Sequence, residues 1–434
     1  MGRRGNPTGL LPWLRSWSPA AAGADALAGL TVAAVLVPGA MAYAHVAGLG
    51  AEIGLYAATI PVLLYGLVGL VPTMSVGPIA SVALLVGIAI GRAGLTDAAE
   101  AAQVAALLAL ACAVVLGAVV ALRLDRLTAR ISPAALAGFV SGVGVLIVST
   151  QVDSLIGLPD DTPHTLWGDL VEVVDDHEQG NWWTIGIAVV TVSGVMLLAR
   201  FAPRVPAGLV AIVAGIAAES LLDLESHGVA VVGSLPAGLP TPSLPRLDGV
   251  TLSMIPVTFG IVVIALVEMS AIVRMWAERG GSADPHRETT ALATVTASAG
   301  VFGTMPVTGS PSRATLAAGA GARTPFTALV TGLAVCVLLL VGTDWIEPLP
   351  VAVVASLVVV AGIRLIRPAR LRALWRGDRT DGVIALVTLA LSVLNIEAGV
   401  VAVVVISAVM ARRGGRGGEP SPTGMEPVSG DRRT

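Results

Sequence analysis

Two apolar runs of this sequence are separated by the stretch Val307-Thr308-Gly309-Ser310-Pro311-Ser312-Arg313-Ala314-Thr315. Ser310 is a good N-cap and Pro311 suits the first position of a helix, so a short helix is predicted to begin here. The N–H groups of Ser312 and Arg313 then lack partners within the helix. An arginine in an apolar region is costly and by default marks a functional site. We expect this helix end to face an anion.

The composition indicates a protein that crosses a membrane many times. Of 434 residues, 55% are hydrophobic and 13% are charged, whereas a soluble protein of this length carries about a quarter charged residues. Lysine is absent, and the abundance of Ala, Val, Gly and Arg indicates a high-GC bacterial genome. The cysteines, Cys112 and Cys336, lie in different apolar runs, which indicates neither a disulfide framework nor a metal cluster. No metal or other cofactor is expected.

Apolar segments recur about fourteen times, and several are shorter than the ~20 residues of a full span. The chain is therefore predicted to be an all-α polytopic protein. A polar lead (1–22) precedes the segments and a Gly-, Pro- and Arg-rich tail (412–434), predicted to be disordered, follows them. The predicted segments are 25–45, 53–70, 75–91, 99–122, 134–151, 182–200, 207–222, 256–277, 288–303, 310–322, 324–341, 347–365, 382–395 and 398–411.

The distribution of arginine gives the orientation. If the N-terminus is cytoplasmic and every segment crosses, the six inner loops from Arg123–Arg130 to Arg412–Arg416 each carry arginine. The outer loop 152–181 is acidic and has no arginine, and the outer loop 223–255 has only Arg246. This sorting follows the positive-inside rule. We therefore expect a multi-pass protein of the inner (plasma) membrane with both termini in the cytoplasm.

Two segments, 71–80 and 304–313, depart from the simple pattern in the same way. Each contains two prolines and a Gly/Ser/Thr approach before a short apolar helix. They are the third and the tenth segments, which occupy equivalent places in a seven-plus-seven arrangement. Interrupted segments at matching positions of two halves indicate a transporter binding site. The odd number of segments in each half makes the halves inverted repeats.

Both half-helices are expected to point their N-termini at one place near the membrane midplane. Each N-terminus behaves like roughly +0.5 of a charge, so the two together suit one anionic group. Irregular backbone at this depth is tolerated only where it is buried in protein or lines a cavity. The residues expected to bind the anion from the half-helices are Gly77, Pro78, Ile79, Ala80, Gly309, Ser310, Ser312 and Arg313.

Several motifs in register from about residue 25 to 411 resemble the SulP anion permeases, also called solute carrier family 26. The first segment contains Pro38-Gly39-Ala40-Met41-Ala42-Tyr43, which is similar to the Pro-Gln-x-x-Ala-Tyr signature of the family. The other matching motifs are Ser75-Val76-Gly77-Pro78, Gly138-Phe139-Val140-Ser141-Gly142-Val143-Gly144 and Met305-Pro306-Val307-Thr308-Gly309-Ser310-Pro311-Ser312-Arg313.

The resemblance implies fourteen segments in two inverted repeats, divided into a core domain that binds the anion and moves as an elevator past a gate domain. Segments 1–4 and 8–11 would form the core, and segments 5–7 and 12–14 the gate. The implied boundaries are 23–130 and 256–342 for the core and 131–255 and 343–411 for the gate. On the family pattern, the first segment places Tyr43 over the anion site beside Ala80, Ser312 and Arg313.

Three features depart from the family pattern. Only about twenty residues follow the last segment, where family members usually carry a cytoplasmic STAS domain. Gly39 replaces the signature glutamine, which removes one polar contact. Ile272 lies one turn after Glu268, where sodium-coupled members have a hydroxyl. Because a hard cation needs several oxygen ligands, this change makes Na⁺ coupling less favoured.

Glu268 lies in the middle of an apolar run and has two interpretations. A carboxyl group poised between loss of hydration and a nearby arginine can take up a proton near neutral pH, which gives symport of H⁺ with the anion. Alternatively, Glu268 forms a structural ion pair with Arg313 or Arg274. The sequence favours neither interpretation over the other.

The favoured function is secondary active transport of a small anion of the sulfate, bicarbonate or dicarboxylate type, with H⁺ as the expected coupling ion. An uncoupled anion channel or a Na⁺-coupled symporter on the same scaffold are the alternatives, and a nucleobase permease fits less well because Ser312-Arg313 replaces an expected acid. An intramembrane enzyme is disfavoured because the segments offer no catalytic constellation. The expected partners are the anion, H⁺, the lipid bilayer and a second copy of the chain, and no nucleic acid.

Overall fold

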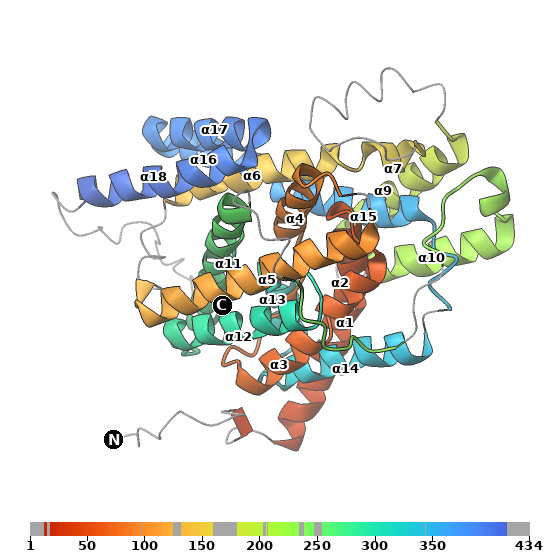
Figure 1. Ribbon diagram of the computed structural model, residues 1–434, viewed down its shortest axis with the longest axis horizontal. Coiled ribbons are helices and arrows are strands. Elements are labelled where there is room, and N and C mark those ends of the chain that lie inside the picture. Colours follow the sequence, from red (N-terminus) through yellow and green to blue (C-terminus); the bar gives the residue numbers. More distant parts are fainter. Residues whose placement is uncertain are drawn as a thin grey trace, which may run out of the picture.

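The computed structural model shows a largely helical protein (Figure 1). The predicted lead and tail lie mostly outside the residues that it describes, as does most of the acidic outer loop 152–181. The described residues are 13–14, 18–95, 97–124, 132–158, 180–202, 205, 207–233, 238–246, 254–342 and 344–414.

Every predicted apolar segment contains a helix; one short strand lies at the start of the third segment and another lies directly before the tenth. The elements of the first half are α1 (Pro19–Val46), α2 (Ala51–Ala57), α3 (Ile60–Val68), β1 (Val76–Gly77), α4 (Ala80–Arg92), α5 (Ala98–Ala121), α6 (Pro133–Ser149), α7 (Val152–Ile156), α9 (Trp182–Phe201), α10 (Ala207–Leu222) and the 3₁₀ helix η4 (Glu225–His227). The elements of the second half are α11 (Met254–Ala277), α12 (Pro285–Val301), β2 (Thr308–Gly309), α13 (Pro311–Gly319), α14 (Phe326–Val341), α15 (Val351–Leu365), α16 (Pro368–Gly377), α17 (Arg379–Leu394) and α18 (Ile396–Gly414).

Seven helices or helix pairs of the described residues are long and apolar enough to cross a membrane, the first being Pro19–Val46. Ala80–Arg92, Ala207–Leu222 and Phe326–Val341 are shorter apolar helices. The predicted membrane class is therefore confirmed. The helices of the third and tenth segments are short because extended chain and a strand precede each of them.

Helices from the two halves of the chain interleave in two packing sets. In set one, α12 packs on α5 and α3, α14 packs on α1 and α3, and α11 packs on α4 and α5. In set two, α6 packs on α15, α17 and α18, while α9 packs on α10 and α15. Figure 1 shows α6, α16, α17 and α18 together at one end of the molecule, and α7, α9 and α10 together at another. The sets meet where α1 contacts α10 and α15, and where α4 contacts α6.

The structure differs from the sequence-based expectation at three places. Helix α1 begins at Pro19, inside the predicted polar lead, because Ser18 caps it by accepting a hydrogen bond from the N–H of Ala21. Helix α18 continues to Gly414, three residues into the predicted tail. Helix α16 (Pro368–Gly377) lies in a stretch that was expected to be an inner loop.

Candidate functional site

The two broken segments meet as a small antiparallel ladder. Val76 pairs with Gly309 and Gly77 pairs with Thr308, and the N–H of Ser310 donates to the carbonyl oxygen of Ser75 at 3.0 Å. All of these residues are buried. The ladder satisfies backbone groups that would otherwise be unpaired in an apolar interior.

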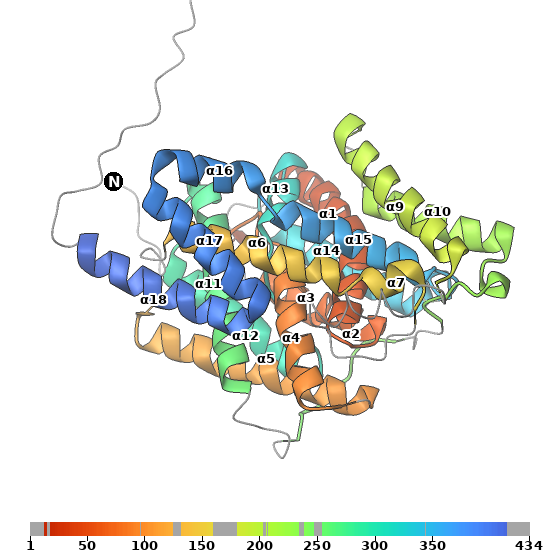
Figure 2. The same cartoon turned by 90° about the horizontal axis from the view of Figure 1, so that it is seen from above.

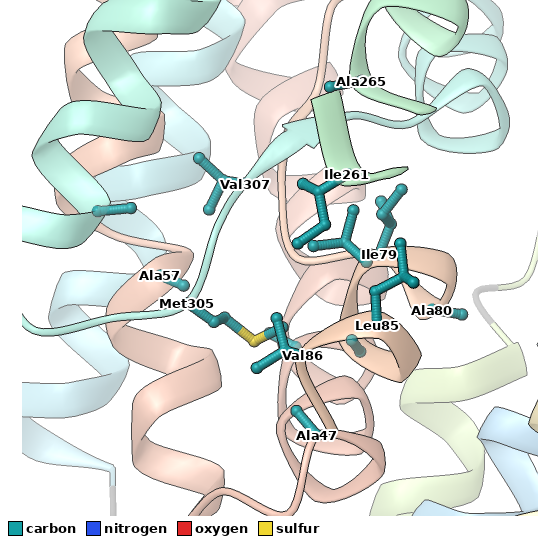
Figure 3. Close-up of a cluster of buried hydrophobic side chains, with 14 of the residues drawn as sticks. Ala47, Ala57, Ile79, Ala80, Leu85, Val86, Ile261, Ala265, Met305 and Val307 are labelled. Carbon is teal, nitrogen blue, oxygen red and sulfur yellow. The ribbon is translucent and has the colours of Figure 1, made fainter. Parts of the chain in front are cut away.

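Apolar side chains surround this ladder and hold it deep in the protein. In Figure 3, Val307 lies beside the strand, while Ile261 and Ala265 come from α11 and Ile79 and Ala80 from the start of α4. Each of these side chains is buried. Packing against the helices of set one therefore fixes the place where the two half-helices begin.

Both half-helices begin directly after the ladder. Helix α13 starts at Pro311 and is capped by Ser310, whose hydroxyl oxygen accepts a hydrogen bond from the N–H of Arg313 at 3.5 Å. The predicted N-cap and first helical residue are confirmed, but the Arg313 N–H that was expected to be free for the anion is bonded to this cap. The Ser310 and Ser312 hydroxyl oxygens are 3.0 Å apart. Helix α4 starts at Ala80 after Ile79 and has no side-chain cap, so its first N–H groups have no partner from a capping side chain.

Arg313 crosses from α13 to the other broken segment. Its Nε donates to the hydroxyl oxygen of Ser75 at 3.0 Å, and its Nη1 donates to the carbonyl oxygen of Pro78 at 3.1 Å. The side chain is buried, and its Nη2 has no hydrogen-bond partner. The guanidinium group is therefore held by two bonds and keeps one donor nitrogen available.

Gly77 is required beneath this guanidinium group. Its φ of +149° is one that residues with side chains rarely adopt. A Cβ atom at this position would lie 2.9 Å from Leu36 Cδ1 and 3.3 Å from Arg313 Nη2. The absence of a side chain leaves room for the arginine and for a group bound to it.

Glu268 on α11 keeps an available carboxylate oxygen. Glu268 and Arg313 interact through their charges, yet among the described residues no ion pair joins Glu268 to Arg313 or to Arg274. Its Oε2 is buried without a hydrogen-bond partner, and Arg274 Nε donates to the carbonyl oxygen of Ser270. The alternative of a structural ion pair is therefore wrong for this structure, because Ser75 and Pro78 hold the arginine elsewhere.

A small cavity adjoins Glu268 at the boundary of the two packing sets. Its volume is about 30 Å³, which accommodates about two water molecules. Helices α4 and α11 of set one and α6 and α15 of set two form its walls. The lining residues are Ser81, Leu136, Phe139, Val140, Val143, Ile264, Val267, Glu268 and Leu365.

Tyr43 lies on α1, where the resemblance places a residue over the anion. It is half-buried and interacts through space with the charges of Arg313, Glu268 and Arg364. A Cβ atom on Gly39 would lie 3.4 Å from the Tyr43 ring, an ordinary contact distance. The ring therefore lies over the glycine that replaces the signature glutamine.

Two buried acids that the sequence analysis did not select support this site. Glu288 on α12 accepts hydrogen bonds at Oε1 from the N–H groups of Leu70 (2.8 Å) and Val71 (3.0 Å), and at Oε2 from the hydroxyl of Tyr65 (2.9 Å). These bonds fix the chain that leads into β1. The signal in the sequence was an acid in the first turn of an apolar helix.

The second acid, Asp25, holds the chain that leaves α13. Its Oδ1 accepts from the N–H groups of Arg323 (2.6 Å) and Thr324 (3.0 Å), and its Oδ2 accepts from the Thr324 hydroxyl (2.5 Å). Asp25 is fully buried in α1. Both broken segments are thus tied to set one by a carboxylate.

The model of the Sulfate permease family matches residues 23–388. The chain belongs to the sulfate permease family. A probable sulfate transporter of Mycobacterium tuberculosis is 30% identical over 399 residues, which cover 91% of this chain and 70% of the relative. The chloroplastic sulfate transporter 4.1 of Arabidopsis thaliana is 28% identical over 386 residues, which cover 87% of this chain and 56% of that protein.

Solved structures show the same fold. Murine solute carrier 26 family member A9, an anion transporter in the inward-facing state, superposes with a TM-score of 0.84 at 23% identity over 93% of this chain and 70% of that chain. The transmembrane domain of a cyanobacterial bicarbonate transporter, BicA, superposes with a TM-score of 0.81 at 19% identity over 92% of this chain and 100% of that chain.

These comparisons confirm the resemblance that the motifs indicated and a membrane transport role. The curated relatives are named as transporters, so the expectation that this chain is not an enzyme is also confirmed. The protein is an anion transporter of the sulfate permease family.

Proposed function

We propose that the chain is a secondary active transporter that carries a small anion together with H⁺. One observation carries the proposal: Arg313 Nη2 and Glu268 Oε2 are both buried without hydrogen-bond partners, close to the starts of α4 and α13. An unpaired buried charge is costly, so each group favours an occupant. An anion satisfies the guanidinium and the helix ends, and a proton neutralises the carboxylate.

The anion site consists of Arg313, the N–H groups at the starts of the two half-helices and the hydroxyls of Ser310 and Ser312. Tyr43 on α1 covers it. Relatives named as sulfate transporters and the bicarbonate transporter of the same fold make sulfate and bicarbonate the first substrates to test. A small dicarboxylate is the third candidate, because one or two negative charges can be offset here.

Set one acts as the moving core and set two as the gate in this proposal, with the boundaries and the inverted repeat predicted from the sequence. The grouping is supported by packing, since α1–α5 and α11–α14 contact mainly one another. The cavity beside Glu268 lies on the sliding boundary between the sets. The termini lie in the cytoplasm of a cell whose plasma membrane contains the protein.

Na⁺ coupling is disfavoured by the surroundings of Ile272. This residue follows Glu268 by one turn of α11 and is fully buried. A Cβ atom on Gly309 would lie 2.9 Å from its Cδ1, so its side chain fills the space against the β2 backbone. An apolar group here supplies no oxygen ligand for a cation.

The test is uptake of labelled sulfate, bicarbonate and C4-dicarboxylates into proteoliposomes, with pH, Na⁺ and voltage gradients imposed in turn. We expect a pH gradient alone to drive accumulation of one of these anions. Failure of all three to be transported or to shift the melting of the purified protein would refute the anion site. Flux that only dissipates anion gradients would instead identify a channel.

Glu268→Gln tests proton coupling separately. We expect the variant to lose pH-driven accumulation while still binding the anion. Glu219→Gln is the matched control, because Glu219 is also buried with an unpartnered Oε2 but lies on α10 in set two. Proton coupling through Glu268 is wrong if Glu268→Gln accumulates anion against a gradient in response to pH as well as Glu219→Gln does.

A further inference from the structure

Helix α16 (Pro368–Gly377) is a basic helix that the transport site does not use. It connects α15 to α17, and none of its residues is buried. Arginines outnumber acids in and around it. The arginines are Arg364, Arg367, Arg370, Arg372, Arg376 and Arg379, and the acids are Asp378 and Asp381. Asp378 caps α17 by accepting a hydrogen bond from the N–H of Thr380.

The helix has an apolar face that is partly covered by protein. At 100° per residue, Leu371, Leu374 and Trp375 lie on one side. Leu371 and Leu374 are half-buried, and α16 packs on α17 and α6. Trp375 packs on Gly382 of α17, where a Cβ atom would lie 2.6 Å from Trp375 Cε3. This packing fixes how the helix is rotated.

The opposite side of the helix presents unpaired positive charge. Arg372 and Arg376 are one turn apart, and Arg370 lies on the other flank. All three are exposed, and within the described part of the chain their guanidinium groups make no hydrogen bond or ion pair. Figures 1 and 2 both show α16 at the edge of the molecule beside α17.

A fixed basic amphipathic helix between α15 and α17, which contain most of two predicted membrane segments, fits the headgroup layer of a bilayer. Trp375 remains 46% exposed beside the arginines, and tryptophan favours the boundary between acyl chains and headgroups. Guanidinium groups bind phosphate in a planar, two-bond geometry. We propose that α16 binds the phosphate groups of anionic lipids in the cytoplasmic leaflet.

Quenching of tryptophan fluorescence by brominated lipids tests this proposal on the full chain in nanodiscs. We expect brominated phosphatidylglycerol to quench more strongly than brominated phosphatidylcholine, and Trp375→Phe to remove that difference. Each arginine near an anionic surface contributes roughly fivefold in affinity. The R370Q/R372Q/R376Q variant should therefore lose about a hundredfold in its preference for phosphatidylglycerol.

Controls separate lipid binding from general charge and from a site for free phosphate. R246Q/R279Q/R323Q removes exposed arginines elsewhere and should keep the preference. R370K/R372K/R376K keeps the charge but loses the two-bond geometry, so it should retain part of the preference. Equal quenching by the two lipids, a preference unchanged in R370Q/R372Q/R376Q, or displacement of the lipid by inorganic phosphate would each overturn the proposal.

Discussion

The Ser75→Ala variant tests whether the position of the Arg313 guanidinium depends on its bond across the ladder. The Ser75 hydroxyl accepts a hydrogen bond from Arg313 Nε at 3.0 Å, and both side chains are buried. Removing the hydroxyl leaves a charged N–H without an acceptor. The substitution should have no other large effect on the structure, because alanine fits wherever serine does.

The expected magnitude follows from the charge on the donor. A hydrogen bond to a charged group contributes about 1.5–3 kcal/mol, roughly twice a neutral one. If all of this free energy is expressed in anion binding, the affinity falls by about tenfold to a hundredfold. If it is expressed in folding, the variant melts at a lower temperature and binds the anion normally. The two outcomes are read from uptake KM and from melting of the purified protein.

Ser141→Ala is the matched control. Ser141 is also buried, but its hydroxyl donates to the carbonyl oxygen of Ala137 within α6, a neutral bond inside one helix. We expect this control to change KM and melting by no more than a neutral bond allows, about 1 kcal/mol. If Ser75→Ala behaves like Ser141→Ala in both measurements, the bond does not hold Arg313 in place and the reasoning fails.

Two further substitutions test the supports of the site. Gly77→Ala should cost about 1–3 kcal/mol in stability and impair uptake, because the φ of residue 77 is unfavourable for alanine and the new Cβ atom meets Leu36. Gly91→Ala is the control: Gly91 has open space around it, so this variant should be neutral in the same melting and uptake assays. Glu288→Ala removes the acceptor of two backbone N–H groups and of the Tyr65 hydroxyl. It should lower the free energy of unfolding by at least about 3 kcal/mol, whereas Glu288→Gln keeps an acceptor and should melt close to the parent protein. Similar melting temperatures of the two Glu288 variants would contradict the role of Glu288 as the acceptor that fixes the chain leading into β1.

The sequence predicted the features of the site that depend on local chemistry. Ser310 and Pro311 specify a helix start whatever lies around them, and the structure has that start. The apolar runs are set by the hydrocarbon thickness of a membrane, so their positions were also predictable. The matched interruptions at the third and tenth segments identified the pair of half-helices because extended chain at that depth has few other uses.

The features that were missed depend on register or on long-range contacts. Arg313 reaches Ser75 only because Val76 pairs with Gly309, and no local pattern specifies that alignment. The lack of an ion pair at Glu268 depends on the same bonds. Helix α16 was missed because its three large apolar residues are too few to form a hydrophobic run among so many arginines.

The separation of Arg313 from Glu268 connects the fold to the proposed transport cycle. A direct ion pair would satisfy both buried groups and would leave nothing for an anion or a proton to bind. Instead, the ladder brings Ser75 and the carbonyl oxygen of Pro78 to the guanidinium group. These bonds use two of the three guanidinium nitrogens and leave the third at the starts of the half-helices. Charged Arg313 and ionised Glu268 together have no net charge, so an anion alone or a proton alone would leave a buried net charge, whereas both together leave none. The binding of one should therefore favour the binding of the other. We infer that the β1–β2 ladder serves to keep the two charges apart.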